Sequence, residues 1–398
     1  MRLSNSVFFY FFFILTQLMS VRFFYNFTLT KNNPEFFFLS YIVLSAVFFL
    51  IFFHYNLIKK ITENTNIFFI ILVIFTAYIF YKYPNSIGTE RDDCYRIIIN
   101  NIYNFNFPYS KTELGDPCST GLSGLILYFP VLFFKNYFAL TTTVSFLMFY
   151  FLLKKYFNKS TLIFLLYIQL FNLLHLEESI AGSDFFLISI SYLVGIIYLN
   201  DYFENKKLTS FFIAFLMLYF FYGSRIVFIF LLPVNYIIFI CIYNFKNVNK
   251  FFIYQFIFTV LTILIPLLIN PTNYHPAHII LKGYNIIGFN ILIYFTLFFS
   301  FLLLINIYFL MNSKKYKNFL SNFINKYNIF LHLSFFVLPL LIIIIKSLID
   351  RINTDLIENW EGLSYMILIY PSFIFIFSSF FKSKKIWNKD FLSKINFK

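Results

Sequence analysis

Charged side chains are scarce in this sequence. Only 12% of its 398 residues are Asp, Glu, Lys or Arg, whereas an ordinary soluble domain has about 25%. Hydrophobic residues make up 60% of the chain instead, against roughly 45 to 50% in such domains. A soluble protein is therefore excluded. At about 20 residues for each crossing, the apolar content is enough for on the order of 12 transmembrane helices, which leaves little chain for a domain outside the membrane.

Several functional motifs are missing as well. The sequence has no glycine-rich nucleotide-binding loop and no His-Glu-x-x-His metal motif, so we expect neither a nucleotide nor another organic cofactor. It also has no internal repeat, Gly-Ser linker or charged low-complexity tract. We therefore predict one all-α, polytopic membrane domain. Its residues 1–83 form N-terminal transmembrane helices, 84–136 form an outside loop, and 137–398 form a second transmembrane region.

Uninterrupted apolar runs give the expected crossings. They lie near residues 7–25, 36–58, 67–83, 137–153, 161–176, 185–200, 208–222, 226–243, 251–269, 286–310, 329–349 and 363–381. The apolar stretch 121–135 has only 15 residues, and the parity of the flanking loops requires it to dip into the membrane without spanning it. No small-x-small cleavage pattern follows the first run, so we expect a retained helix and not a signal peptide.

The charges segregate between alternate loops. If the chain starts inside, 20 of the 31 basic residues lie on the inner side, and 13 of the 17 acidic residues lie on or near the outer side. Because cytoplasmic loops retain Lys and Arg, we predict cytoplasmic N- and C-termini in a multi-pass protein of a bacterial inner membrane. The same rule explains the net charge of +14 without nucleic acid as a partner.

The longest outside loop, residues 87–124, carries the candidate catalytic residues Asp92 and Asp93. They stand at the start of an amphipathic helix predicted over residues 93–105, which would lie against the bilayer. Its predicted bilayer-facing side consists of Ile97, Ile98 and Ile102. A carboxylate at the mouth of an apolar cavity can have a raised pKa and act as a general base toward a hydroxyl group. The alternative is that the pair only caps this helix and complements its dipole.

A second acidic group lies on the same side of the membrane. Glu177 and Glu178, close to His175, follow the end of one crossing, and Asp184 precedes the next. All three acids are candidates for substrate binding. The alternatives are that Asp184 is the N-cap of the following helix and that the two glutamates are solvated loop charges.

Two further outside segments carry basic side chains. Arg225 lies in a turn so short that it must sit at the outer membrane edge; its planar guanidinium suits a lipid phosphate, and the alternative is that it snorkels to headgroups. The next outside loop contains His275, His278 and Lys282. The two histidines could hold a metal, but Pro276 between them argues against one helical face, which favours substrate contact.

The cysteines divide between the two sides. Cys94 and Cys118 lie 24 residues apart in the long outside loop, where oxidation is possible. We predict a disulfide that pins the helix of the acidic pair to the segment that begins at Gly121. Cys241 lies near the inner face and should stay reduced.

The order of these motifs resembles the GT-C glycosyltransferase superfamily, which includes polyprenol-phosphate-sugar-dependent mannosyl- and aminoarabinosyltransferases. The resemblance covers residues 87–233. It is carried by Arg91-Asp92-Asp93, Gly115-Asp116-Pro117, the segment around Pro130, Gly182-Ser183-Asp184-Phe185-Phe186 and Gly223-Ser224-Arg225. In that superfamily the acidic loop usually follows the first helix, whereas three hydrophobic segments precede it here. Two additional helices leave the loop on the same side of the membrane.

The resemblance implies an inverting transfer of a sugar from a polyprenyl-phosphate carrier to a glycan, lipid or protein acceptor on the outer side. Asp92 or Asp93 would remove the proton of the acceptor hydroxyl, while Arg225 and Lys282 would stabilise the departing phosphate. The remaining candidates for substrate binding are Arg91, Arg96, Asp116, Glu177, Glu178, Asp184, His275 and His278. Members of the superfamily variably use a divalent metal, so metal dependence stays open here.

Two other classes work on related substrates. A polysaccharide polymerase or O-antigen ligase uses the same lipid-linked sugars, but tends to place essential arginines in large outside loops late in the chain. A transporter or flippase of lipid-linked saccharides would need charges near the middle of its spans, and the predicted spans have none. Both remain alternatives to the transferase.

Overall fold

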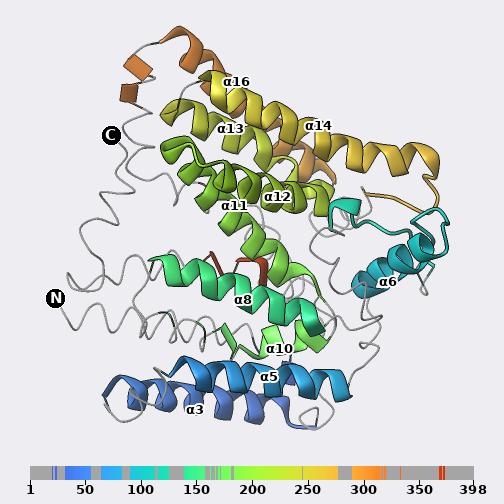
Figure 1. Cartoon of the computed structure of the whole chain (residues 1–398), viewed down its shortest axis with the longest axis vertical. Coiled ribbons are helices and arrows are strands. Elements are labelled where there is room, and N and C mark those ends of the chain that lie inside the picture. The colour runs from blue at the N-terminus through green and yellow to red at the C-terminus, as the bar shows by residue number, and fades with distance from the viewer. Residues whose placement is uncertain are drawn as a thin grey trace. The chain divides into compact units, whose positions relative to one another are not determined.

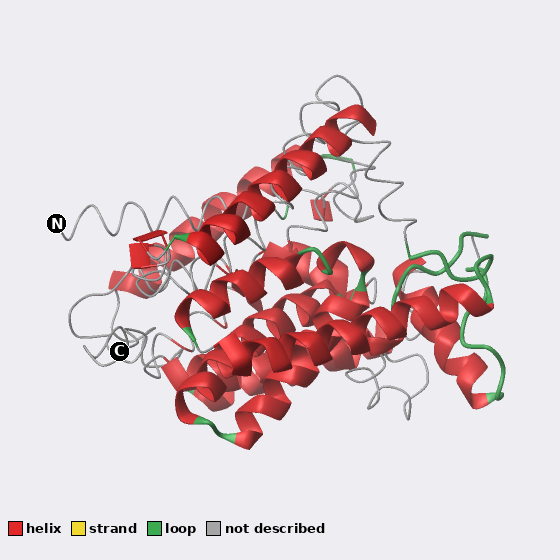
Figure 2. Cartoon of the chain, turned by 90° about the horizontal axis from the view of Figure 1, so that it is seen from above, coloured by secondary structure: helices red, strands yellow, loops and turns green. Residues whose placement is uncertain are grey.

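The computed structural model describes much of the chain between residues 20 and 372. The described residues are 20, 23–24, 32–54, 64–82, 90–112, 115–124, 139–156, 162, 166, 169–170, 172–180, 183–243, 245–276, 289–313, 315–316, 318–319, 332, 367–369 and 371–372. They form helices joined by loops, and no strand occurs in this part of the chain (Figure 2). The expected all-α fold is therefore confirmed for the described residues.

The helices follow the predicted apolar runs. In chain order they are α3 (Pro34–His54), α5 (Thr65–Lys82), α6 (Glu90–Tyr103), the 3-10 turn η1 (Leu122–Gly124), α8 (Ala139–Tyr156), α10 (Leu173–Ile180), α11 (Phe185–Asn205), α12 (Leu208–Ser224), the 3-10 turn η2 (Ile226–Phe228), α13 (Leu231–Ile242), α14 (Phe245–Ile269) and α16 (Phe289–Asn312) (Figure 1). The runs predicted at 7–25, 161–176, 329–349 and 363–381 lie wholly or partly outside the described residues. So does most of the predicted dipping segment 121–135.

Two helices of the described part, α11 and α14, are long and apolar enough to cross a membrane. A third span results if α12 and the segment Ile226–Ile242 are counted together, although the pair is bent by 120° at the break between them. Two separate crossings were expected there, near residues 208–222 and 226–243. These helices indicate a membrane-associated protein, and the full set of twelve crossings stays a prediction.

α14 presents an apolar surface to its surroundings. Its exposed large side chains are Ile253, Tyr254, Phe256, Ile257, Phe258, Leu261, Leu264, Ile265, Leu268 and Ile269. Its buried face carries the polar side chains of Gln255 and Thr259 among nonpolar ones that include Phe251, Phe252 and Ile263. A surface helix in water places polar side chains outward. An exposed face as apolar as that of residues 253–269 is expected where lipid replaces water.

The chain divides into two compact units, and unit 1 comprises residues 1–89, 134–190 and 351–391. Within it α5 packs on α8, where the rings of Phe68 and Phe146 have centroids 6.1 Å apart. Farther along the same two helices, the hydroxyl oxygens of Thr76 and Thr143 lie 2.7 Å apart. Hydrogen bonds of this kind between helices stabilise helix association in lipid.

Unit 2 comprises residues 90–133, 191–350 and 392–398. In it α12 packs on α14 through Phe215 and Phe258, whose ring centroids are 5.7 Å apart. α13 also packs on α14, with 5.6 Å between the ring centroids of Tyr236 and Phe252. Aromatic side chains therefore fill the spaces between the helices of this unit.

A buried hydrogen-bond network centred on Asn235 connects three helices of unit 2. The Asn235 amide donates to the Tyr222 hydroxyl over 2.6 Å, and its oxygen accepts from the Tyr192 hydroxyl over 3.2 Å. The same oxygen lies 2.6 Å from Nδ1 of His332. All four side chains are fully buried. Because polar groups in a low-dielectric interior are costly when unpaired, the network favours one arrangement of α11, α12 and α13.

The start of η1 meets the end of α12 at two glycines. The Gly121 amide donates to the Ser224 carbonyl over 3.0 Å. A Cβ atom on Gly121 would overlap the backbone carbonyl of Gly223, and a Cβ atom on Gly223 would overlap the side chain of Ser123. Glycine is therefore required at both positions by the close approach of the two backbones.

We predict that Gly121→Ala and Gly223→Ala each lower the free energy of unfolding by about 1 to 3 kcal/mol, as overpacking does. The two substitutions should respond differently when Ser123 is first replaced by Gly. In that background Gly223→Ala should have almost no effect on stability, because the side chain that its Cβ would overlap is gone. Gly121→Ala should remain destabilising, because its Cβ would still overlap the backbone carbonyl of Gly223. Thermal unfolding in detergent measures both differences. Wild-type stability of Gly121→Ala would contradict the close approach.

Candidate functional site

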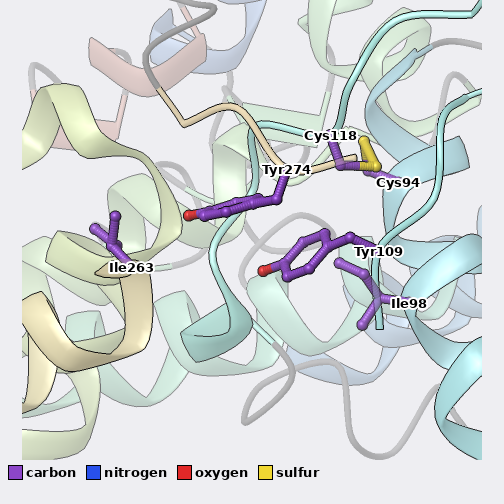
Figure 3. Close-up of a cluster of buried hydrophobic side chains, with 6 residues drawn as sticks. All are labelled: Cys94, Ile98, Tyr109, Cys118, Ile263 and Tyr274. Atoms are coloured by element: carbon purple, nitrogen blue, oxygen red, sulfur yellow. A yellow bond between two sulfur atoms is a disulfide. The ribbon is translucent and has the colours of Figure 1, made fainter. Parts of the chain in front are cut away.

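Cys94 of α6 and Cys118 of the loop before η1 are joined by a disulfide, with 5.5 Å between their Cα atoms. This is the pair predicted from the sequence. The bond lies in a buried cluster of unit 2 whose members are Cys94, Ile98, Tyr109, Cys118, Ile263 and Tyr274 (Figure 3). The bond joins α6 to the loop before η1, and the cluster packs both segments against Ile263 of α14. The remaining cysteine, Cys241, is a buried free thiol.

The loop around Cys118 pairs with the loop that follows α14. The Cys118 amide donates to the Asn273 carbonyl over 3.1 Å, and the His275 amide donates to the Cys118 carbonyl over 2.9 Å. These bonds form an isolated parallel bridge between Cys118 and Tyr274. Two loops that lie more than 150 residues apart in the sequence, and that were both expected outside, are therefore adjacent.

Two tyrosines stack at this junction. The ring centroids of Tyr109 and Tyr274 are 4.3 Å apart, and both hydroxyl groups point away from the disulfide (Figure 3). The Tyr109 hydroxyl donates to the Thr120 carbonyl over 3.0 Å. The Tyr274 hydroxyl is buried without a hydrogen-bond partner among the described residues.

Both phenol groups stay protonated at neutral pH. Burial raises the pKa of Tyr109 well above its ordinary value. Burial also raises the pKa of Tyr274, and the positive charge of Arg225 acts in the opposite direction without cancelling this effect. Because the charged form is disfavoured in a buried site, each hydroxyl can act as a neutral hydrogen-bond donor.

Arg225 lies at the break between α12 and η2, where the chain turns. Only 6% of its surface is exposed. Its Nη1 donates to the Ser119 hydroxyl over 3.1 Å, which places the guanidinium beside the residue that follows Cys118. The interpretation that Arg225 snorkels to headgroups is wrong, because the side chain is buried among residues of unit 2.

The candidate bases Asp92 and Asp93 lie in the first turn of α6, which begins at Glu90. The helix therefore starts before them and neither is its N-cap, but their first-turn positions agree with the other part of that interpretation, that they complement the helix dipole. Their side chains and that of Arg91 lie outside the described residues. Arg96, one turn further along the helix, is half-buried.

α6 turns a different face inward from the one predicted. The helix was expected over residues 93–105 and ends instead at Tyr103. It buries Tyr95, Ile98 and Ile99 against the rest of unit 2, while Ile102 is exposed. Ile97, Ile98 and Ile102 therefore do not form one bilayer-facing side, because the disulfide at Cys94 orients the helix toward the protein.

The remaining candidates in unit 2 lie in its loops. Asp116 is half-buried, and its carbonyl accepts from the Thr112 amide over 2.9 Å. Gly115, the residue before it, has a φ of 84° that glycine adopts readily. His275 is half-buried. His278 and Lys282 lie outside the described residues.

The second acidic group lies in unit 1. Glu178 and Asp184 are buried and Glu177 is half-buried, so the interpretation of Glu178 as a solvated loop charge is wrong. The Asp184 carbonyl accepts from the Ile188 amide over 2.9 Å, which is the first bond of α11. Asp184 therefore occupies the N-cap position, as the alternative interpretation predicted.

His175 is packed between aromatic rings of unit 1. Its ring centroid lies 5.0 Å from that of Phe146 and 4.3 Å from that of Phe186, edge to face in both cases. Its Nδ1 lies 3.3 Å from Nε2 of Gln169. Asn172 caps α10, the helix that contains His175, because its side-chain oxygen accepts from the Leu174 amide over 3.0 Å. These contacts indicate a packing role for His175.

The described residues contain no group of three or more His, Cys, Asp or Glu side chains that could hold a metal ion. The proposed histidine pair is not tested by this finding, because His278 lies outside them. Metal dependence stays open.

Sequence reasoning missed three residues of the junction. Ser119, Tyr109 and Tyr274 contact Arg225 or each other, but none carries a charge or belongs to a recognised motif. Their only signal is position, since Ser119 follows a cysteine of the predicted disulfide and Tyr274 precedes His275. The candidate residues also divide between the units, with Arg96, Asp116, Arg225, His275 and the backbone of the acidic pair in unit 2, and Glu177, Glu178 and Asp184 in unit 1.

We predict that the non-reduced, denatured protein contains one alkylatable thiol, that of Cys241. Replacing Cys94 and Cys118 by Ser should lower the free energy of unfolding by about 2 to 4 kcal/mol, because the bond closes a loop of this length. Mass spectrometry after alkylation and thermal unfolding in detergent measure the two effects. Three alkylated thiols in the non-reduced wild type would contradict the disulfide.

The motif order resembles a known superfamily, and a direct comparison could support or oppose that resemblance. Comparison of the chain with protein-family models, with curated proteins and with solved structures gives no match. Membership of the GT-C superfamily therefore stays a prediction from the motifs.

Proposed function

We propose that this chain is an integral-membrane glycosyltransferase that moves a sugar from a polyprenyl-phosphate carrier to an acceptor on the outer side of the membrane. The observation that supports it most is the burial of Arg225 at the break between two apolar helices. A guanidinium has five N–H donors in a planar fork, which suits a phosphate better than an ammonium group does, and a buried charge within apolar helices often marks a functional site. A lipid-linked phosphate is an anion that reaches this depth together with its apolar chain.

The connection between Arg225 and the acidic pair supports the same reaction. Asp93 is the neighbour of Cys94, which is bonded to Cys118, and the next residue, Ser119, accepts a hydrogen bond from Arg225. One covalent and one hydrogen-bonded link therefore join the candidate base segment to the candidate phosphate ligand. Both lie in unit 2, whose helix α14 has the surface of a lipid-facing helix.

The proposed chemistry needs a base and a stabilised leaving group. A carboxylate of Asp92 or Asp93 takes the proton of the acceptor hydroxyl, and the acceptor oxygen forms its bond to the anomeric carbon on the face opposite the phosphate. The bond from that carbon to the phosphate oxygen breaks, so the configuration inverts. Arg225 then stabilises the negative charge on the departing lipid phosphate.

Neutral hydrogen-bond donors around Arg225 would also bind the phosphate. The buried hydroxyl of Tyr274 stays protonated, and Tyr274 lies close enough for the charge of Arg225 to influence its pKa. The Thr120 hydroxyl is also buried without a hydrogen-bond partner among the described residues. Phosphate oxygens accept hydrogen bonds from such groups, whereas the Tyr109 hydroxyl already donates to the Thr120 carbonyl.

We predict that undecaprenyl phosphate raises the melting temperature of the purified protein in detergent, whereas undecaprenol, which lacks the phosphate, does not. Arg225→Gln should weaken the apparent affinity for undecaprenyl phosphate at least about tenfold, as the loss of a charge-assisted hydrogen bond does. Arg225→Lys should weaken it less, because the charge is retained and the planar fork is lost. Equal shifts with both lipids would contradict the phosphate site.

Replacing either acid of the pair Asp92 and Asp93 should lower the rate of sugar transfer. We predict that Asp92→Asn or Asp93→Asn lowers the release of polyprenyl phosphate from lipid-linked sugars in isolated membranes by about 10² to 10⁴-fold, the usual contribution of a general base. Mass spectrometry of the lipid product measures it. Glu113→Gln, which removes another acid of the same loop, is the matched control and should keep wild-type activity. Full activity in both Asp variants would exclude a base at this position.

A further inference from the structure

The last turn of α6 and the turn that follows it expose apolar side chains. Ile102 is 41% exposed, Tyr103 is 52% exposed and Phe105 is 98% exposed. No residue between Arg96 and Lys111 is charged, although an exposed segment in water usually carries several charges. Residues 102–105 are called the α6 tip below.

The backbone at Phe105 adds a second observation. Its φ is 56°, in the left-handed region that favours Gly or Asn at the end of a helix. The Asn106 amide donates to the Asn101 carbonyl over 2.8 Å, which closes the helix end around Phe105. Asparagines stand on both sides of it, at 104 and 106. A phenylalanine in this conformation, with its ring exposed, is costly in water on both counts.

The neighbouring surface indicates what the α6 tip meets. α6 is tied through Cys94 and Cys118 to the loop that follows α14. The last turn of α14 exposes Leu268 and Ile269, with 79% and 66% of their surfaces accessible, and this apolar face continues along the helix. The α6 tip therefore belongs to a compact unit that has an apolar, lipid-type surface close to where the loops are joined.

We propose that the α6 tip inserts into the interfacial region of the bilayer, with Phe105 and Tyr103 at the boundary between headgroups and acyl chains. Aromatic side chains and neutral amides suit this region, because it offers both apolar contact and hydrogen bonds. The exposed Lys111 ends the uncharged segment, so the chain leaves the interfacial region there. The buried face of α6 stays against the protein, so the tip, and not the helix face, holds the loop at the membrane.

Site-directed spin labelling tests the proposal on the full chain in nanodiscs that contain anionic lipid. A nitroxide is attached at Asn106→Cys in a Cys241→Ser background, with Phe105 intact, and its collision rates with oxygen and with a water-soluble nickel chelate are compared. Lys111→Cys, labelled in the same way, is the control. We expect a ratio of oxygen to nickel accessibility several-fold higher at 106 than at 111. Phe105→Ser, added to the 106 label, should return the ratio to the control value.

Two other results of the labelling experiment would overturn the proposal. Equal, water-like ratios at 106 and 111 would overturn the proposal, because the α6 tip would then lie in water. Low accessibility to both reagents at 106 would also overturn it, since the tip would be covered by protein such as a second copy of the chain.

Discussion

Water is absent from the hydrocarbon core of a bilayer, so polar groups on membrane helices are favoured on the side that faces the protein. α14 follows this rule with Gln255 and Thr259 turned inward and large apolar side chains outward. The network around Asn235 follows it as well, because its four fully buried members are joined by hydrogen bonds. The apolar exposed face of α14 indicates a helix that faces lipid, and in such surroundings a buried charged side chain such as Arg225 is a functional candidate.

The disulfide between Cys94 and Cys118 holds together the segments around the loop at residues 104–121. It connects α6 with Cys118, whose backbone pairs with the loop after α14 and whose neighbour Ser119 accepts a hydrogen bond from Arg225. Three segments that are distant in sequence thus form one body. The proposed transfer would require a fixed distance between the proposed base in α6 and the phosphate that we propose Arg225 binds, and this linkage would maintain it.

Sequence patterns predicted the helices well because long apolar runs leave few alternatives in a membrane protein. The disulfide was also foreseen, since two cysteines share one loop. The burial of Arg225, the covered face of α6 and the buried Glu178 were not, because each depends on contacts between segments far apart in the chain. Tyr274 shows most clearly why contacts between distant segments could not be predicted from the sequence. Its importance comes from a bridge to Cys118, and no local motif encodes that pairing.

The most direct test of the central claim is the mass profile of envelope glycolipids and glycans from cells that lack this protein, compared with cells in which the wild-type chain is restored. The proposed transferase predicts that one defined sugar unit disappears and returns on complementation. A collapse of glycan chain length would contradict it in favour of a polymerase or ligase. An unchanged profile would contradict it in favour of a transporter or another function.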